Sequence, residues 1–380
     1  MTTLLPCQRA LFEIPDEIAY LNCAYMSPIL RSTREAGQAG IGRKSQPWQI
    51  HPADFFTGPE RARALVAELI GGDADGVAIV PSAGYGIAVA AANVPVAAGQ
   101  RIVVLADQFP ANVYAWREVA RRQGAEVVTV PWPEDHDWTR SILAHLDERV
   151  AVVTAPHCHW TNGSLVDLVR IGQAARSVDA ALVVDATQSL GAYPLDVQAV
   201  QPDFLIAATY KWLLGPYSLG FLYVAPRFRE GTPLEYGWVN RAGSEDFRNL
   251  VQYRDAYQPG ARRFDMGEHA NFSLLPMAIN ALEQLLAWGV SSIAATIGEL
   301  TNLLEGEARR LGLQPVPAEY RGNHLIGIRM PEGVAADLEA RLAAAQVYVS
   351  LRGQSIRVAP HVYNTAAEIG RLVAVLATVV

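Results

Sequence analysis

The amino-acid sequence predicts an α/β fold, in which helices flank a mainly parallel sheet and a smaller α+β domain follows. Through the middle of the chain, short runs of Val, Ile, Leu and Ala alternate with amphipathic helical stretches. Strand and helix in turn, joined by short connections, are typical of a doubly wound α/β domain. The apolar runs also lack alternating polar residues, which indicates strands that are buried on both faces.

Each element of the larger part is predicted from one run of residues. Runs of aliphatic, often β-branched residues predict strands at Gly76–Val80, Arg101–Ala106, Glu126–Val130, Val150–Ala155, Ala181–Val184, Phe204–Ala208 and Leu219–Val224. Apolar residues at helical spacing predict helices at Ile87–Val94, Ala111–Gln123 and Asp167–Val178.

The pattern changes after residue 226. Residues 227–263 are polar, aromatic and glycine-rich, which is typical of a loop region that covers an active site, and a loop at a dimer interface is the alternative. The C-terminal part predicts helices Ser273–Gly289, Ser291–Leu311, Val334–Ala345 and Ala366–Thr378, and strands His324–Met330, Tyr348–Arg352 and Ser355–Ala359. We therefore expect an N-terminal segment, 1–50, that packs with the small domain, a large domain, 51–265, and a small C-terminal domain, 266–380.

Composition limits the classes of function. With 380 residues, about half of them hydrophobic, the chain can bury a large core. The net charge of −7 gives no basic surface for nucleic acid or for an anionic membrane, so we expect neither as a partner. Three cysteines without paired spacing, and no signal peptide, favour a cytoplasmic location.

Lys211 is the most informative residue, because the chain has one other lysine, Lys44, among 31 basic residues. It lies in the apolar stretch Phe204–Gly215. Burial lowers the pKa of an ammonium group and makes the amine a nucleophile that forms Schiff bases. The alternative is a lysine at a strand end whose ammonium reaches solvent, and Lys211 alone does not decide between the two.

Ligands bind at the carboxyl edge of such a sheet, and polar or glycine-rich groups follow four of its predicted strands. Pro81–Gly86 can turn backbone N–H groups toward an anion at a helix start, although by itself a tight turn is the simpler explanation. Asp185 ends a buried strand and needs a partner; the alternative is a salt-bridged or helix-capping aspartate. Lys211 follows the next strand, and Gln108–Asn112 brings the ring of Phe109 to the same edge.

Together these groups are what pyridoxal 5′-phosphate (PLP) requires. A lysine holds the aldehyde as a Schiff base and later carries a proton, and a carboxylate keeps the pyridine nitrogen protonated. A helix start binds the phosphate, and an aromatic ring stacks on the cofactor. We therefore predict a PLP site without a metal ion, with Lys211 and Asp185 as its catalytic residues.

The chain resembles the class V aminotransferase superfamily, PLP-dependent enzymes of fold type I. The superfamily includes cysteine desulfurases, selenocysteine lyases, kynureninases and isopenicillin N epimerases. The resemblance runs from Tyr20–Pro28 to Ser355–Thr365, and its most specific segments are Val184–Gly191 and Thr209–Pro216. It implies PLP as the cofactor, a small amino acid as the substrate, and a homodimer with shared active sites.

Carried over residue by residue, the resemblance implies a role for each matching position. Lys211 would form the Schiff base, and Asp185 would pair with the pyridine nitrogen. The other cofactor-binding residues would be Gln188 at the ring hydroxyl, Phe109 on the ring, Tyr210 at the phosphate through its hydroxyl, and Gly84 and Tyr85 at the phosphate through their N–H groups. The substrate-binding residues would be Arg357 at the α-carboxylate, together with Asn22, His159 and Trp160.

Three departures from the pattern of the superfamily bear on the reaction. The stretch Val347–Ser355 holds no cysteine where desulfurases carry a mobile nucleophilic one, which argues against persulfide formation. His157–Asn162 replaces an asparagine expected near the cofactor, so we expect His159 or Trp160 to fill that space and the substrate pocket to differ. In Arg263–Glu268, which reaches across the dimer interface in the superfamily, Glu268 replaces a threonine that binds phosphate.

A dinucleotide-binding turn is the first competing interpretation. Gly84–Val89 has part of the required glycine spacing, and Asp107 stands at the distance of a ribose-binding carboxylate, as in an NAD-dependent oxidoreductase. Val89 stands where that turn needs a small residue, and Lys211 would then have no role.

Two further interpretations are a metal site and a non-catalytic module. His157 and His159 form a candidate metal pair, but no third ligand is obvious. A PLP-fold protein that only binds a ligand would not need both Lys211 and Arg357.

Within the superfamily, Tyr363–Thr365 and Tyr210–Trp212 resemble the lyase and epimerase branch. We therefore expect an external aldimine that loses its Cα proton to Lys211, followed by cleavage at Cβ, as in a lyase. Transamination is the second alternative and epimerisation of an amino acid the third.

Overall fold

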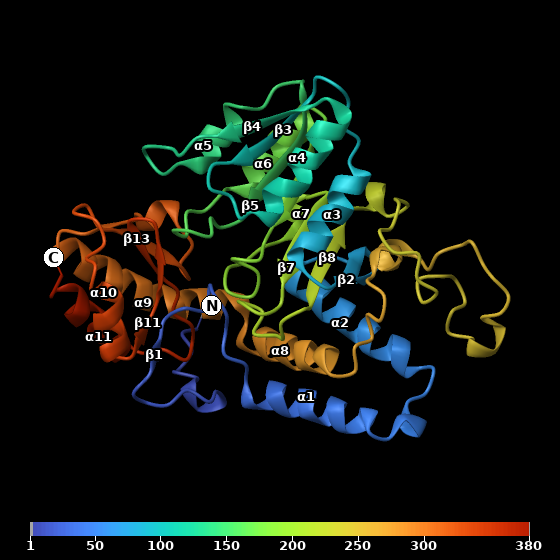
Figure 1. The fold of residues 1–380 in the computed structure, drawn as a ribbon, viewed down its shortest axis with the longest axis horizontal. Coiled ribbons are helices and arrows are strands. Elements are labelled where there is room, and N and C mark those ends of the chain that lie inside the picture. The colour runs from blue at the N-terminus through green and yellow to red at the C-terminus, as the bar shows by residue number, and fades with distance from the viewer. Residues whose placement is uncertain (1–2, 380) are drawn as a thin grey trace.

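The computed structural model describes residues 3–379 of the chain, and its centre is one large sheet (Figure 1). In the described residues this sheet has seven strands in the order β2-β8-β7-β6-β5-β3-β4. The strands are β2 Val77–Val80, β3 Arg101–Leu105, β4 Glu126–Val130, β5 Val150–Pro156, β6 Ala181–Asp185, β7 Phe204–Ala208 and β8 Gly220–Val224. Only β8 runs antiparallel to its neighbours, β2 and β7, so the predicted mainly parallel sheet is confirmed.

Helices cover both faces of this sheet. Successive residues of a strand point to opposite faces, so Ile102 and Val104 of β3 join one core while Val103 and Leu105 join the other. Two helices pack on the first face, α3 Ala83–Asn93 and α4 Ala111–Gln123. The second face is covered by α2 Asp54–Ile70, α5 Trp138–Leu143, α6 Leu168–Ser177, α7 Val197–Val200 and α8 Leu274–Trp288. Burial on both sides explains why the strands are apolar without alternation.

Helix α3 begins four residues earlier than the sequence predicts, at Ala83 instead of Ile87. Ser82 is its N-cap, and its hydroxyl accepts the N–H of Tyr85 at 3.1 Å. Such a cap offsets the low helix propensity of glycine, which hid the first turn from the apolar pattern. As a result, Gly84 and Tyr85 lie inside the first turn of the helix.

The C-terminal part forms a second sheet with its own core. Its strands, in the antiparallel order β12-β13-β10-β9, are β12 Ser350–Arg352, β13 Ser355–Val358, β10 Ile326–Arg329 and β9 Gln314–Pro315. Its helices are α9 Val290–Arg310, α10 Leu338–Ala344 and α11 Ala366–Leu376. The predicted strand 348–352 is divided, because β11, Val347–Tyr348, pairs in parallel with β1, Ala19–Tyr20.

The N-terminal segment contacts both parts of the molecule. β1 joins the small domain through β11, and helix α1, Arg31–Lys44, packs against α8 beneath the large sheet (Figure 1). The division at residues 50 and 265 stays a prediction. Within residues 3–379, no helix combines the length and the apolar character needed to span a membrane.

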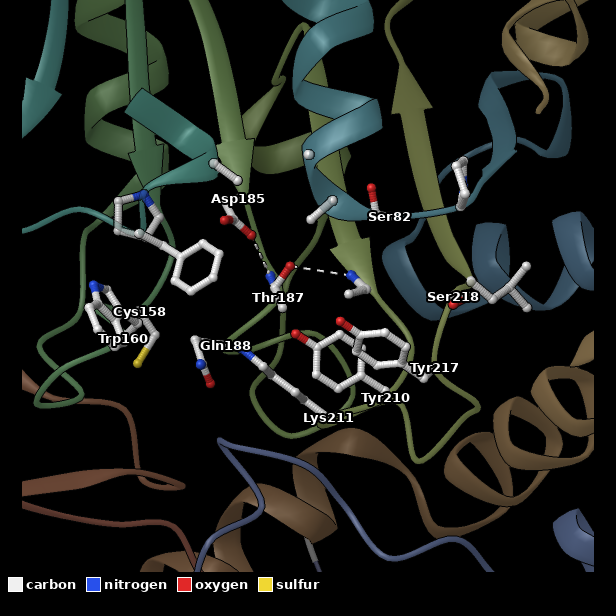
Figure 2. Close-up of a pocket in the computed structure, with 18 of the residues that line it drawn as sticks. Ser82, Cys158, Trp160, Asp185, Thr187, Gln188, Tyr210, Lys211, Tyr217 and Ser218 are labelled. Carbon is white, nitrogen blue, oxygen red and sulfur yellow. Dashed lines mark hydrogen bonds between the residues drawn. The ribbon is translucent and has the colours of Figure 1, made fainter. Parts of the chain in front are cut away.

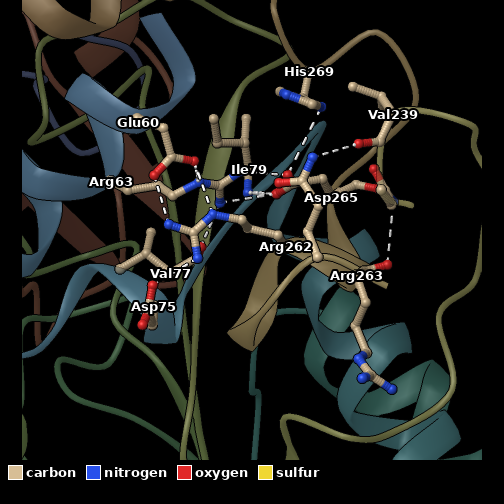
Figure 3. A network of polar contacts seen from close by, with 12 residues as sticks. Glu60, Arg63, Asp75, Val77, Ile79, Val239, Arg262, Arg263, Asp265 and His269 are labelled. Atoms are coloured by element: carbon tan, nitrogen blue, oxygen red, sulfur yellow. Dashed lines mark hydrogen bonds and ion pairs between the residues drawn. The ribbon is translucent and has the colours of Figure 1, made fainter. Parts of the chain in front are cut away.

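A buried ion pair fixes the edge of the large sheet (Figure 3). Arg63 of α2 and Asp265 are 1% and 2% exposed, and Nη1 of the arginine lies 3.0 Å from Oδ1 of the aspartate. The same oxygen accepts the N–H of Ile79 at 2.8 Å, and Arg63 donates to the carbonyl of Val77. Both of these backbone groups belong to the edge strand β2, so the ion pair occupies polar groups that would otherwise be open to another strand.

We expect Asp265→Ala to lower the free energy of unfolding by about 3–5 kcal/mol, because Arg63 then loses its buried counter-charge and keeps only the half-buried Glu60, 3.0 Å away. Glu283→Ala is the matched control, since Glu283 pairs with an exposed arginine, Arg61, at 2.7 Å. Loss of an exposed pair should cost at most about 1 kcal/mol. Urea unfolding followed by circular dichroism measures both, and equal losses would contradict the role of the buried pair.

Candidate functional site

A cavity of about 350 Å³ lies at the carboxyl edge of the large sheet. The parallel register places Asp185, the last residue of β6, beside Pro156 of β5 and Ile206 of β7. Figure 2 shows Asp185 and Thr187 facing the side of the cavity that holds Tyr210 and Lys211. Cavities of this size hold small organic ligands.

Lys211 lines this cavity although only 6% of the residue is exposed. Its Nζ lies 5.4 Å from the ring centres of both Phe109 and Tyr210. The pKa of the Lys211 amine is lowered to about 8, chiefly by burial; the carboxylate of Asp185 opposes this shift and Arg357 adds to it. The amine therefore becomes neutral, and nucleophilic, at a lower pH than an exposed lysine.

The carboxylate of Asp185 is held in a fixed orientation. Its Oδ1 accepts the N–H of Thr187 at 2.9 Å, and the hydroxyl of Thr187 accepts the N–H of Ala208 at 3.2 Å. Both bonds are buried, and the second joins the residues that follow β6 to the end of β7. Asp185 can therefore meet a protonated ring nitrogen without reorganisation.

The side-chain amide of Gln188 is also oriented by two partners. The indole N–H of Trp212 donates to its Oε1 at 3.0 Å, and its Nε2 donates to the carbonyl of Ala24 at 3.1 Å. An indole N–H only donates and a carbonyl only accepts, so the amide cannot be reversed. Gln188 lines the cavity, and the second N–H of its Nε2 can serve a ring oxygen of the cofactor.

The first turn of α3 forms another side of the cavity, through Ser82, Ala83 and Gly84. The N–H of Tyr85 is taken by the hydroxyl of Ser82, so the N–H groups that remain at this helix start are those of Ala83 and Gly84. A Cβ atom at Gly84 would approach nothing closer than 3.7 Å, so this side is open to a phosphate. Tyr85 does not line the cavity, and Ala83 stands in its place.

Trp160, and not His159, occupies the space that the sequence assigns to one of them. Trp160 lines the cavity in edge contact with Phe109, with ring centres 5.6 Å apart. His159 is fully buried behind it, where its ring bonds to the carbonyl of Ala106 at 3.1 Å and to Thr161 at 2.8 Å. Burial lowers the pKa of His159 to about 4, so its ring is neutral.

His157 does not form a metal pair with His159, because its ring bonds separately to Ser189, at 3.0 Å. In residues 3–379 there is no cluster of three His, Cys, Asp or Glu side chains that could hold a metal ion.

Arg357 and Asn22 lie just behind the cavity lining. Arg357 is 1% exposed and donates to the carbonyl of Trp160 at 2.7 Å and to the hydroxyl of Ser350 at 3.3 Å. Ser350 in turn donates to Asn22 at 2.8 Å. Burial lowers the pKa of Arg357 to about 10. In the described part of the chain its bonded partners are neutral, so this buried cation lacks a counter-ion.

The cavity residues that were not singled out from the sequence include Cys158, Tyr217 and Ser218. The last two lie on the loop between Lys211 and β8, where Leu214 and Ser218 have φ angles of 53° and 66°. Only the Gly215–Pro216 pair marks this turn in the sequence. Burial raises the pKa of the Cys158 thiol to about 12, so it stays protonated at neutral pH.

The predicted covering loop, residues 227–263, does not cover this cavity. None of its residues lines the cavity, and the loop projects from the opposite side of the large domain (Figure 1). Its aromatic side chains Trp238 and Phe247 pack against Phe55 of α2 instead. The loop therefore does not cover the cavity of its own chain, since aromatic composition does not reveal which surface the rings pack on, and a role at an interface stays a prediction.

The model of the family "Aminotransferase class-V" matches residues 51–372 of the chain. The chain belongs to the class-V aminotransferase family. Similar proteins include an uncharacterized aminotransferase, YcbU, of Bacillus subtilis, 31% identical over 81% of this chain and 80% of that protein. Isopenicillin N epimerase of Streptomyces clavuligerus is 27% identical over 82% of each chain, and a kynureninase of Deinococcus radiodurans is 30% identical over 72% of this chain and 71% of its own.

Solved structures share the fold of this class-V aminotransferase family member. A C-DES variant with glycine covalently linked to its PLP cofactor superposes with a TM-score of 0.86 at 19% identity, over 97% of this chain and 99% of that one. The apo cysteine desulfurase of Thermococcus onnurineus gives 0.84 at 17% identity, over 100% and 99%.

Membership of the class-V aminotransferase family confirms four predictions: the superfamily, fold type I, an enzyme, and PLP as the cofactor. The cavity fits this group, because a buried amine, an oriented carboxylate and an open helix start converge on it. The dinucleotide interpretation is left without support, since Gly84 faces the cavity of Lys211.

We expect the Lys211 amine to titrate with a midpoint near pH 8 in the cofactor-free protein, with the neutral form dominant above that pH. Because the chain has two lysines, protein labelled with ¹³C at the lysine ε-carbon gives two signals, and Lys211→Arg identifies the one of interest. The Asp185 carboxylate raises this pKa, so Asp185→Asn should move the midpoint to lower pH. A midpoint above pH 10, or an upward shift in Asp185→Asn, would contradict the described electrostatics.

We expect Trp212→Phe to weaken PLP binding about 2- to 12-fold, because Gln188 loses the bond that orients its amide, worth about 0.5–1.5 kcal/mol. Trp116→Phe is the matched control, since this buried indole has no hydrogen-bond partner in the described chain. Fluorescence titration of the cofactor-free protein with PLP compares the two variants. An equal loss of affinity in both would show that ring volume, and not the bond to Gln188, is what matters.

Proposed function

We propose that this enzyme removes the Cα proton of an α-amino acid and then eliminates a group from Cβ, as a lyase that forms no persulfide. The observation that carries the proposal is the buried Lys211 amine, with a pKa near 8, placed opposite the oriented carboxylate of Asp185. Similar proteins named kynureninase and cysteine desulfurase, and a cystine C–S lyase with the same fold, support cleavage. The similar protein named an aminotransferase supports transamination as the second candidate.

Different residues of the cavity bind the cofactor and transfer the proton. Bound PLP supplies an electron sink that weakens the bonds at the substrate Cα. Asp185 pairs with the ring nitrogen and Gln188 donates to the ring oxygen, while the N–H groups of Ala83 and Gly84 bind the phosphate. Lys211, neutral near pH 8, takes the Cα proton and delivers it again.

Two aromatic side chains complete the cofactor site in this proposal. Phe109 and Tyr210 line the cavity, where Phe109 would pack on the cofactor ring and the hydroxyl of Tyr210 would bind the phosphate. Burial raises the pKa of Tyr210, which keeps this hydroxyl a hydrogen-bond donor.

Arg357 is the receptor for the substrate α-carboxylate. It is a buried guanidinium without a counter-ion in the described residues, and a planar fork suits a bidentate carboxylate. Asn22 positions it through Ser350, and Trp160 fixes it through its carbonyl.

Three features argue against a persulfide step. The stretch Val347–Ser355 contains strands β11 and β12 and no cysteine. Cys158 lines the cavity, but burial holds its thiol protonated, with a pKa of about 12. Burial likewise raises the pKa of Cys23. Attack on sulfur needs a thiolate, which neither buried cysteine provides at neutral pH.

We also propose a homodimer with shared active sites. Large aromatic residues are exposed, among them Trp48 at 73% and Tyr253 at 97%, and exposed apolar surface can mark an interface. Glu268 lines a separate cavity of about 480 Å³ with Lys44 and Trp238, away from Lys211 of its own chain. A cytoplasmic location stays a prediction.

Product analysis with a panel of amino acids tests the reaction. A lyase forms a keto acid and an equal amount of the leaving group without a keto-acid acceptor, whereas a transaminase needs the acceptor and an epimerase changes only the configuration. We expect Lys211→Ala to reduce turnover by about 10²–10⁴-fold or more, because the proton carrier is lost. Borohydride should fix PLP covalently to the wild type but not to Lys211→Ala, and full turnover by that variant would remove Lys211 from the mechanism.

A further inference from the structure

A second cleft adjoins the cofactor cavity. It has a volume of about 930 Å³ and lies between the small-domain sheet and the loops that follow β3, β4 and β5. Gln108 and Trp160 line both the cleft and the cavity of Lys211. A substrate seated at Lys211 therefore has room for its side chain beyond these two residues.

Gln108 lies where the cleft meets the cofactor cavity, and its side-chain amide has no hydrogen-bond partner in the described chain. The residue is 6% exposed, and neither Nε2 nor Oε1 of its amide has a hydrogen-bond partner in the described chain. A buried polar group without a partner costs about 1–3 kcal/mol, and native proteins tolerate few of them. A ligand group that both accepts and donates at this point would remove that cost.

Arg352 brings positive charge to the same junction. Its guanidinium lies over the ring of Trp160, 5.3 Å from the ring centre, and its Nη1 donates to the carbonyl of Leu351 at 2.7 Å. Its Nε is buried without a partner among residues 3–379. Arg352 also lowers the pKa of both Lys211 and Arg357, so it acts on the substrate end of the site.

Arg352 and Arg357 have no ion-pair partner among the described residues that bond to them. Asp185 is the carboxylate that acts on the Lys211 amine, against Arg352 and Arg357. In the proposed function the substrate α-carboxylate pairs with Arg357. Arg352, which contacts the carbonyl of Leu351 and the ring of Trp160, would then still have no carboxylate bonded to it.

Acidic and basic side chains lie on opposite sides of the cleft. Asp107 and Glu134 lie on the large-domain side, where the indole N–H of Trp132 donates to Asp107 at 2.6 Å. Arg352 and Arg329 lie on the small-domain side. An anionic group that extends from Lys211 past Trp160 therefore comes within reach of Arg352, whose guanidinium lies over that ring.

We propose that this cleft is a side-chain subsite for a second carboxylate, so that the substrate is an α-amino acid with an acidic side chain. Arg352 binds the side-chain carboxylate, and the amide of Gln108 bonds to polar atoms between the two ends. The proposal rests on the proposed function for the place of the α-carboxylate at Arg357.

The test uses the PLP-loaded protein and acids that lack an amine, so that they bind without reacting. Calorimetry compares unbranched dicarboxylic acids of increasing length with monocarboxylic acids of the same lengths. At the best length, the dicarboxylate should bind at least about tenfold more tightly, since a charge-assisted carboxylate–arginine pair is added. Arg352→Gln should abolish this difference, whereas Arg309→Gln, which removes one charge from the exposed side of α9, should preserve it.

Gln108→Glu provides a second, nearly isosteric variant. The added negative charge should weaken the dicarboxylate about tenfold relative to the monocarboxylate, because it repels the second carboxylate. The proposal is overturned if no dicarboxylate binds or if the two classes bind equally. It is also overturned if Arg352→Gln weakens both classes by the same factor, which would assign Arg352 to the α-carboxylate. Failure of the proposed function looks different, as a protein in which borohydride fixes no PLP at Lys211.

Discussion

The site depends on the removal of the Lys211 amine from water. Burying an ammonium group is unfavourable, and the fold offsets part of this cost with one carboxylate, Asp185, at the end of the neighbouring strand. The parallel register fixes that placement, because β6 and β7 end at the same edge of the sheet. The strands around them are apolar on both faces, so little solvent screens the pair. The reactivity of the amine is thus a property of the whole sheet.

The small domain makes a charged Lys211 amine still less favourable. Its strands β12 and β13 carry Arg352 and Arg357, and both cations lower the pKa of Lys211. Buried like charges persist where anionic ligands offset them, so perturbed groups of this kind cluster at functional sites. The large domain supplies the amine and the helix start, and the small domain supplies the guanidinium groups. A ligand with anionic groups at both ends would therefore join the two domains electrostatically.

The sequence was sufficient to predict the site residues that follow strand ends. It was insufficient to predict those residues whose role depends on the orientation of the side chain. Lys211 and Asp185 follow unbroken apolar runs, and such strands place their last residues at a common edge. His159 and Trp160 are adjacent, and which of them points into the cavity depends on packing against distant residues. The start of α3 was missed because the cap at Ser82 is a local hydrogen bond that hydrophobic periodicity does not record. The unpaired amide of Gln108 is likewise visible only when all of its neighbours are known.

The residues that line the cavity indicate that the substrate side chain, and not an additional catalytic group, decides which reaction takes place. Lys211 can carry a proton for elimination, transamination or epimerisation, and the nearby Cys158 thiol stays protonated. What happens at Cβ then depends on whether the bound side chain contains a leaving group. If Arg352 holds a carboxylate beyond Cβ, elimination requires that this carboxylate belongs to the departing group. A β-substituted alanine with an acidic substituent satisfies both conditions, because the residue that recognises the side chain would also stabilise the group as it leaves.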